Sequence, residues 1–139
     1  MKLTLTAILY CFLSLAFGQT EKEHPIDMKL QNCLDSSENY ATKGMTDGLV
    51  RATEKWEEEL NKSWQELLPL LTTEQKEKLK IAQRQWLEYR NKEIEFSNQI
   101  YSDTRGTMWT PVAAQTKLEL TKQRVIEIEA YIANLTMAK

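Results

Sequence analysis

Apolar residues recur every three or four positions along three long stretches of this chain. That spacing is the period of a helix face turned towards a core. The first stretch predicts a helix from about Thr46 to Leu71, with charged residues largely on its other faces. Pro69 is expected to perturb the last turn, because proline cannot donate the helical hydrogen bond. The buried face is expected to consist of Leu49, Thr53, Trp56, Leu60, Trp64, Leu67 and Leu71.

A second helix is predicted from just after Thr72 to about Tyr101. Thr72 suits the N-cap position, and Gln75 completes a capping box with it. Arg90 lies one turn beyond Trp86, where a guanidinium can stay packed while it pairs with a carboxylate of another helix. The face expected to turn inward carries Leu79, Ala82, Trp86, Tyr89, Phe96 and Ile100.

Two arginines are therefore expected to be substantially buried. Arg90 should pair with Glu57 or Glu58 of the first long helix. Arg124, on the third apolar stretch, is a second candidate for burial. It too is expected to pair with an acidic residue of the first long helix.

The third helix is predicted to begin at Pro111, since proline suits the first position of a helix. Residues 102–110 before it are expected to form an exposed connection with turn residues Asp103 and Gly106. Two interpretations of Trp109 stay open: it folds back to cap the core, or it contacts a partner. The apolar face of the third helix is expected to contain Ala114, Leu118, Thr121, Val125, Ile128, Ile132 and Leu135.

The N-terminus has the pattern of a cleaved secretory signal peptide over residues 1–18. Lys2 precedes an apolar run, and Ala16 and Gly18 are the small residues that a signal peptidase needs. The run is short for a membrane span, so no stable membrane insertion is expected after cleavage. Cys11 suggests a lipoprotein as the alternative, but the bulky Tyr10 occupies the position where a small residue is needed.

Residues 19–44 are expected to form an N-terminal segment with a short helix from Pro25 to Leu34. His24, before that helix, is expected to be a solvated tail residue. Cys33 is the one cysteine beyond the signal, and we expect a buried or half-buried thiol rather than a bridge between chains. With a core domain over residues 45–137, the fold class is all-α: a small helical bundle of three long helices plus the short one.

Composition and charge exclude several function classes. The 139 residues carry a net charge of −2 without an acidic or basic block, so no nucleic-acid partner is expected. Removing residues 1–18 takes away only Lys2 among the charged residues and makes the net charge −3. One histidine and one mature cysteine are too few ligands for a structural zinc site, so no metal is expected. No catalytic constellation occurs, so we expect neither an enzyme nor a cofactor.

Four motifs follow one another in the sequence. They are Glu59-Leu60-Asn61 with Trp64, the run Leu79 to Asn91 that contains Ala82-Gln83-Arg84, Gly106-Thr107-Met108, and Leu120-Thr121 with Arg124. Together they resemble the signatures of the LprI-like lysozyme-inhibitor family of bacterial secreted proteins, over about Cys33 to Ile132. The residues matched to family positions, expected to be mainly structural, are Glu57, Leu60, Asn61, Trp64, Ala82, Gln83, Trp86, Tyr89, Arg90, Thr121 and Arg124.

The chain departs from the family most clearly in its cysteines. The resemblance implies four of them, of which Cys33 fills the first position and Gly48, Ile94 and Thr116 occupy the others. Gly48 and Ile94 occupy two of the four cysteine positions, which fits the loss of one complete disulfide bridge. By this resemblance, the position of Thr116 would then be that of the missing partner of Cys33. Trp64, Asn91 and Glu57 replace the family's Tyr, Asp and Asp.

The resemblance implies binding rather than catalysis. Its expected partner is a lysozyme, a cationic cell-wall hydrolase, met in the periplasm or outside the cell. The alternative is a periplasmic structural or interaction module that does not inhibit lysozyme. No oligomeric state follows from the sequence. The exposed connection supplies the candidate partner contacts, Asp103, Arg105, Met108 and Trp109.

Overall fold

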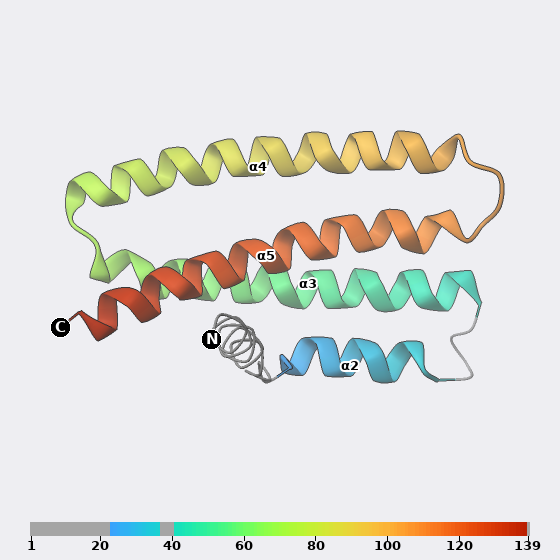
Figure 1. The fold of residues 1–139 in the computed structure, drawn as a ribbon, viewed down its shortest axis with the longest axis horizontal. Helices are drawn as coiled ribbons and strands as arrows, with labels where there is room; N and C mark the ends of the chain where they lie inside the picture. Colours follow the sequence, from blue (N-terminus) through green and yellow to red (C-terminus); the bar gives the residue numbers. More distant parts are fainter. Residues whose placement is uncertain (1–22, 37–40, 139) are drawn as a thin grey trace, which may run out of the picture.

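The computed structural model describes residues 23–36 and 41–138, which form an all-α bundle (Figure 1). Helix α2 spans Pro25–Leu34, and α3 spans Thr42–Leu67 and continues into the 3-10 turn Leu68–Leu70. The other two long helices are α4, Thr73–Ser102, and α5, Trp109–Met137. The predicted fold class is therefore confirmed.

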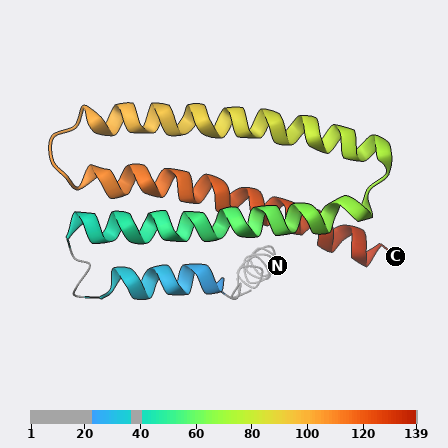
Figure 2. The same cartoon turned by 180° about the vertical axis from the view of Figure 1, so that it is seen from behind.

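Helix α5 occupies the middle of the bundle. It packs along α3 on one side and α4 on the other, while α2 lies along the outer side of α3 (Figures 1 and 2). Towards its C-terminus α5 crosses α3 and moves away from α4. No comparable packing joins α3 directly to α4 within the described residues.

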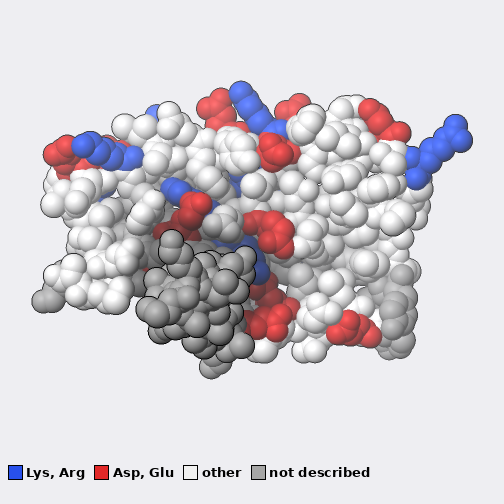
Figure 3. All heavy atoms as spheres, viewed as in Figure 1, with Lys and Arg blue, Asp and Glu red and all other residues white. Residues whose placement is uncertain are grey.

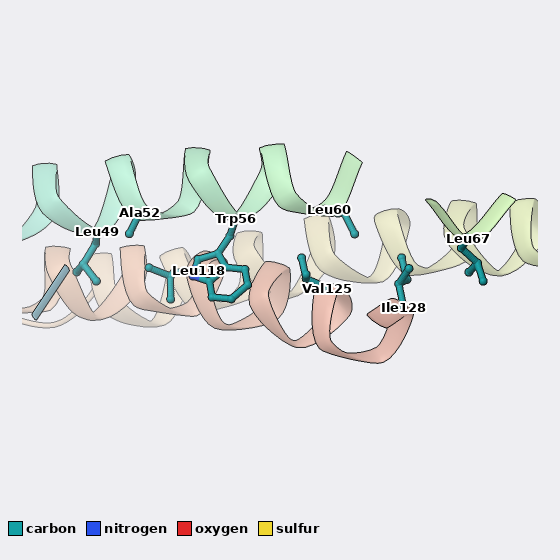
Figure 4. Packing of buried hydrophobic residues seen from close by; sticks show 8 residues of the cluster. All are labelled: Leu49, Ala52, Trp56, Leu60, Leu67, Leu118, Val125 and Ile128. Atoms are coloured by element: carbon teal, nitrogen blue, oxygen red, sulfur yellow. The ribbon is translucent and has the colours of Figure 1, made fainter. Parts of the chain in front are cut away.

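The core lies between α3 and α5, as the first and third apolar stretches predict. Trp56 of α3 is 1% exposed, and Val125 of α5 is fully buried. Figure 4 shows the two sets of side chains meeting between the two ribbons. The buried apolar residues are Leu49, Ala52, Trp56, Leu60 and Leu67 of α3 with Leu118, Val125 and Ile128 of α5.

Helix α2 packs against α3 through contacts with Trp56. The indole Nε1 of Trp56 donates to Asp27 Oδ1 over 3.2 Å, and Asp27 also forms an ion pair with Lys122 of α5 at 2.7 Å. The ring of His24 packs on Trp56 with centroids 4.3 Å apart. His24 Nδ1 also accepts from the Ile26 backbone, which makes it the N-cap of α2. The expected solvated His24 is therefore wrong, because its contact comes from a helix distant in sequence.

Helix ends differ from the predictions by a few residues. Helix α3 begins at Thr42 rather than Thr46, and its α-helical part ends at Leu67 because Pro69 tightens the chain into a 3-10 turn. The capping box of Thr72 and Gln75 is present. Helix α5 begins at Trp109, two residues before the expected Pro111.

Helix α4 is less buried than its apolar stripe predicts. Tyr89, Phe96 and Ile100 are exposed to 54%, 60% and 46%, Ala82 is also exposed, and only Ser97 of this helix is buried. The prediction that all four turn into the core is wrong. Among the described helices, α4 packs closely along α5 and reaches α3 only through side chains such as Arg90. One closely packed neighbour covers a narrower strip of a helix than two neighbours would.

None of the described helices combines the length and apolar character needed to cross a membrane.

Cys33 is half-buried on α2, as predicted, and Arg51 Nη2 lies 3.4 Å from its sulphur. Its neighbour across the α2–α3 contact is Gly48. A Cβ atom added to Gly48 would lie 3.2 Å from Cys33 Sγ. Thr116 instead shares a hydrogen bond of 3.0 Å with Ser97 of α4. The expected pairing of Cys33 with position 116 is therefore wrong, and position 48 faces Cys33.

The first prediction is that Gly48→Cys forms a disulfide with Cys33 in an oxidising buffer. The bridge would close a loop of roughly 15 residues and stabilise the fold by about 3 kcal/mol. Intact mass should show the loss of two hydrogens, and thermal unfolding should move upward without reductant.

Gly48→Ser is the matched control, because it adds a side chain at the same place and cannot bridge. A bridged protein no more stable than this control, or a thiol that stays titratable, would contradict the geometry. Thr116→Cys should leave Cys33 unbridged.

Candidate functional site

Residues of the family motifs meet around Trp86, the half-buried indole of α4. The guanidinium carbon of Arg90 lies 5.1 Å from the centre of the indole, and that of Arg124 of α5 lies 5.8 Å from it. Both distances suit cation–π attraction. Trp86 therefore holds two arginines from two helices in fixed places.

Arg90 links α4 to α3. Its Nη1 lies 3.5 Å from Glu57 Oε1, and Lys117 Nζ of α5 lies 3.0 Å from the same oxygen. The Arg90 side chain is only 14% exposed, so the predicted pairing with Glu57 is confirmed. Glu58, the other candidate, pairs with Lys55 instead. The buried Nε of Arg90 has no hydrogen-bond acceptor among the described residues.

Arg124 is buried as well, but its partners differ from the prediction. Its Nε donates to Gln83 Oε1 of α4, and its Nη1 donates to Glu127 of α5, each over 2.9 Å. The acidic partner thus comes from its own helix and not from α3. In this contact the side-chain amide of Gln83 accepts through its oxygen, Oε1.

A polar cleft lies between α3 and α4, where these two helices are joined by side chains. Its volume is about 330 Å³. We call it the α3–α4 cleft, and its lining residues are Glu57, Leu60, Asn61, Trp64, Gln83, Leu87 and Arg90. All but Leu87 belong to the motif residues singled out from the sequence. Of the remaining motif residues, Ala82 and Tyr89 are exposed, and Thr121 is buried in α5.

One titratable group beside Asn61 is perturbed. A hydrogen bond to Glu59 raises the pKa of Lys62. This exposed ammonium therefore stays charged throughout the neutral range.

The connection between α4 and α5 forms one end of the bundle. Asp103 caps α4, since its backbone N–H donates to Gln99 and Tyr101 carbonyls, and its carboxylate accepts from Gln99 over 3.1 Å. Gly106 has a φ of 107°, which a residue with a side chain rarely adopts. Asp103 and Arg105 are exposed, and Met108 is 63% exposed.

Trp109 is half-buried at the start of α5. Its ring stacks on Tyr101 of α4 with centroids 5.6 Å apart and planes 11° apart. This packing favours the first interpretation from the sequence, in which the indole folds back on the bundle. Met108 is accordingly the more accessible of the two apolar side chains.

An apolar groove adjoins the connection. Its volume is about 530 Å³, and Met108 forms part of its wall. Sequence periodicity does not predict this groove, because it combines residues of α2, α3 and α5 that are distant in the chain. We call this groove together with residues 103–109 the connection end. The groove is lined by Leu34, Thr42, Met45, Leu49, Met108, Pro111, Val112 and Gln115.

Within residues 23–36 and 41–138, no group of three or more His, Cys, Asp or Glu side chains is arranged to hold a metal ion.

The second prediction concerns the Arg90 contact. Arg90→Ala should lower the free energy of unfolding by about 1–3 kcal/mol, because the stacking on Trp86 and the charged contact are both lost. Glu57 is 38% exposed and keeps Lys117, so the larger penalty of a stranded buried charge does not apply. Urea unfolding measures the change.

Arg84→Ala is the matched control, because it removes an exposed arginine from the same helix. It should change stability by less than about 0.5 kcal/mol. Equal effects of Arg84→Ala and Arg90→Ala would contradict the assigned role of Arg90.

The fold occurs in a solved structure. It matches the crystal structure of an uncharacterised protein from Burkholderia thailandensis with a TM-score of 0.75 and 23% sequence identity. The match covers 82% of this chain but 56% of that one, so this chain spans little more than half of its relative. At this identity the likeness concerns the fold alone. No curated protein matches the chain.

The family comparison covers most of the chain. The model of the family described as lysozyme inhibitor LprI matches residues 33–128. That range extends from Cys33 on α2 into the buried part of α5, and it includes both the α3–α4 cleft and the connection end. The chain belongs to the lysozyme inhibitor LprI family.

Proposed function

We propose that this chain is an exported protein that inhibits a lysozyme by binding it through the connection end. Family membership over residues 33–128 is the observation that carries the proposal. The signal-peptide pattern of residues 1–18, which lie outside the described part of the chain, supports export.

The connection end has the chemistry of a protein-binding surface. Protein interfaces combine an apolar centre with a polar rim. Here Met108 and the adjoining groove supply apolar surface, while Asp103 and Arg105 stand beside them. Figure 3 shows that the face over this end of the bundle carries few charged side chains. The connection also lies at the tip of the bundle, where it can enter a concave partner (Figure 1).

Lysozyme itself offers complementary groups. Its cleft contains the two catalytic carboxyl groups of a retaining glycosidase. The exposed guanidinium of Arg105 is suited to pairing with such a carboxylate, and Met108 to filling apolar space beside it. A net charge of −3 on the mature chain would also attract the cationic enzyme at long range.

The third prediction is that the chain from Gln19 onward slows the lysis of cell walls by a c-type lysozyme. The effect should weaken as salt rises, because added ions screen the long-range attraction. Met108→Asp and Arg105→Glu should each reduce inhibition about tenfold or more, as expected for interface centres. A turbidity assay with purified protein measures both effects.

Met137→Asp is the matched control for Met108→Asp. Met137 is 77% exposed and lies near the C-terminus of α5, at the other end of the bundle. Trp109→Phe should keep the stacking on Tyr101 and retain most of the inhibition. No slowing at large molar excess and low salt would reject the inhibitor proposal and favour a periplasmic interaction module. Inhibition that survives both connection variants would keep the function and discard the site.

The fourth prediction tests export. Expression of the whole chain in a Gram-negative host should give a periplasmic protein that begins at Gln19 and carries no lipid. Intact mass decides this. Retention of residues 1–18, or the added mass of a diacylglycerol on Cys11, would contradict it.

A further inference from the structure

We propose that the α3–α4 cleft binds a saccharide. The cleft is separate from the connection end. Arg90 precedes Asp103 by about 13 residues of α4, which corresponds to roughly 20 Å along the helix. The inference therefore does not depend on the proposed inhibition of lysozyme.

Several polar groups in the cleft have unused hydrogen-bonding capacity. Gln83 accepts from Arg124 through Oε1, which leaves the two Nε2 hydrogens without an acceptor in the described chain. The buried Nε of Arg90 also lacks one. No side-chain hydrogen bond of the described residues engages Asn61, whose amide supplies a donor and an acceptor at the cleft wall. A buried donor such as Arg90 Nε normally has a partner. The exposed amide of Asn61 and the half-buried amide of Gln83 line the same cleft, so a polar ligand is the natural complement of the three groups.

The lining suits an uncharged ligand rich in hydroxyl groups. The lining holds one carboxylate, Glu57, and one guanidinium, Arg90, whose Oε1 and Nη1 lie 3.5 Å apart. Lys117 binds the same oxygen from outside the lining, so both charged groups of the cleft already have charged partners. Each hydroxyl of a sugar both donates and accepts, as the amides and the carboxylate require. Trp64, Leu60 and Leu87 supply the apolar surface on which the C–H face of a sugar ring packs.

The groups of the cleft are also held in place before any ligand arrives. Arg90 is fixed between Trp86 and Glu57, and Gln83 is fixed by Arg124. Preorganised polar groups lower the cost of binding. The volume of about 330 Å³ lies at the lower end of the range of small-ligand pockets, roughly 300–1,000 Å³. A short oligosaccharide that leaves part of its length in solvent fits this description.

Two sources of saccharide share this chemistry: N-acetylated glycans such as those of cell walls, and plain glucans. The side-chain amides of Asn61 and Gln83 can pair with an acetamido group, and Leu60 or Leu87 can pack against its methyl. We therefore expect N-acetylated sugars to bind more tightly.

The fifth prediction is tested by calorimetric titration of the mature chain with tri-N-acetylchitotriose and, separately, cellotriose, both without lysozyme. Gln83→Glu should weaken binding about tenfold, because it removes the Nε2 donors while keeping an acceptor for Arg124. Gln85→Glu on the same helix makes the same charge change at an exposed position outside the cleft, and should leave binding unchanged. Trp64→Leu should also weaken binding.

The outcomes separate this proposal from the proposed function. Binding of chitotriose alone identifies the N-acetylated source, and equal binding of both sugars supports the saccharide site without that preference. Failure of both sugars to bind at millimolar concentration would overturn the proposal. It would also be overturned if Gln83→Glu and Gln85→Glu changed binding equally while unfolding curves showed that both variants are folded. Inhibition of lysozyme should be the same in Gln83→Glu as in the unchanged chain.

Discussion

The packing of α3 against α5 is the contact on which the other parts of the molecule depend. Trp56, Leu118 and Val125 leave almost no surface to solvent, and with the other buried side chains of α3 and α5 they form the apolar core of the described residues. Helix α2 uses Trp56 as its anchor, and α4 uses the opposite side of α5. Truncation of Trp56 would therefore remove core volume and the docking point of α2 together.

That arrangement also explains where the two candidate sites lie. Because α5 separates α3 from α4, those helices leave a gap that is bridged by a long side chain, that of Arg90, which reaches Glu57 of α3. Six of the motif residues of α3 and α4 line this gap. The connection end arises where α4 turns back into α5 beside the start of α3, as the contact of Thr107 with Thr42 at 3.4 Å illustrates.

Periodicity was sufficient to predict the helices and both faces of the α3–α5 core, because those faces follow from local sequence. It was not sufficient for α4, whose stripe has the same period although no second helix covers Tyr89 or Phe96. The pairing of Arg90 with Glu57 followed from a buried guanidinium needing a carboxylate. His24 on Trp56, and Gly48 against Cys33, depend on how α2 lies across α3, which no local pattern records.

The shallow burial of α4 has a consequence for motion. Helix α4 fully buries only Ser97, and its Leu79 and Trp86 pack half-buried against the core, so it loses less apolar contact than α3 or α5 would when it lifts from its neighbour. Its local opening therefore costs less than global unfolding. Its backbone amides would exchange with solvent through this opening sooner than those of the α3–α5 core. A molecule held by both α3 and α4 would suppress the opening, so that slower amide exchange along α4 would report its presence.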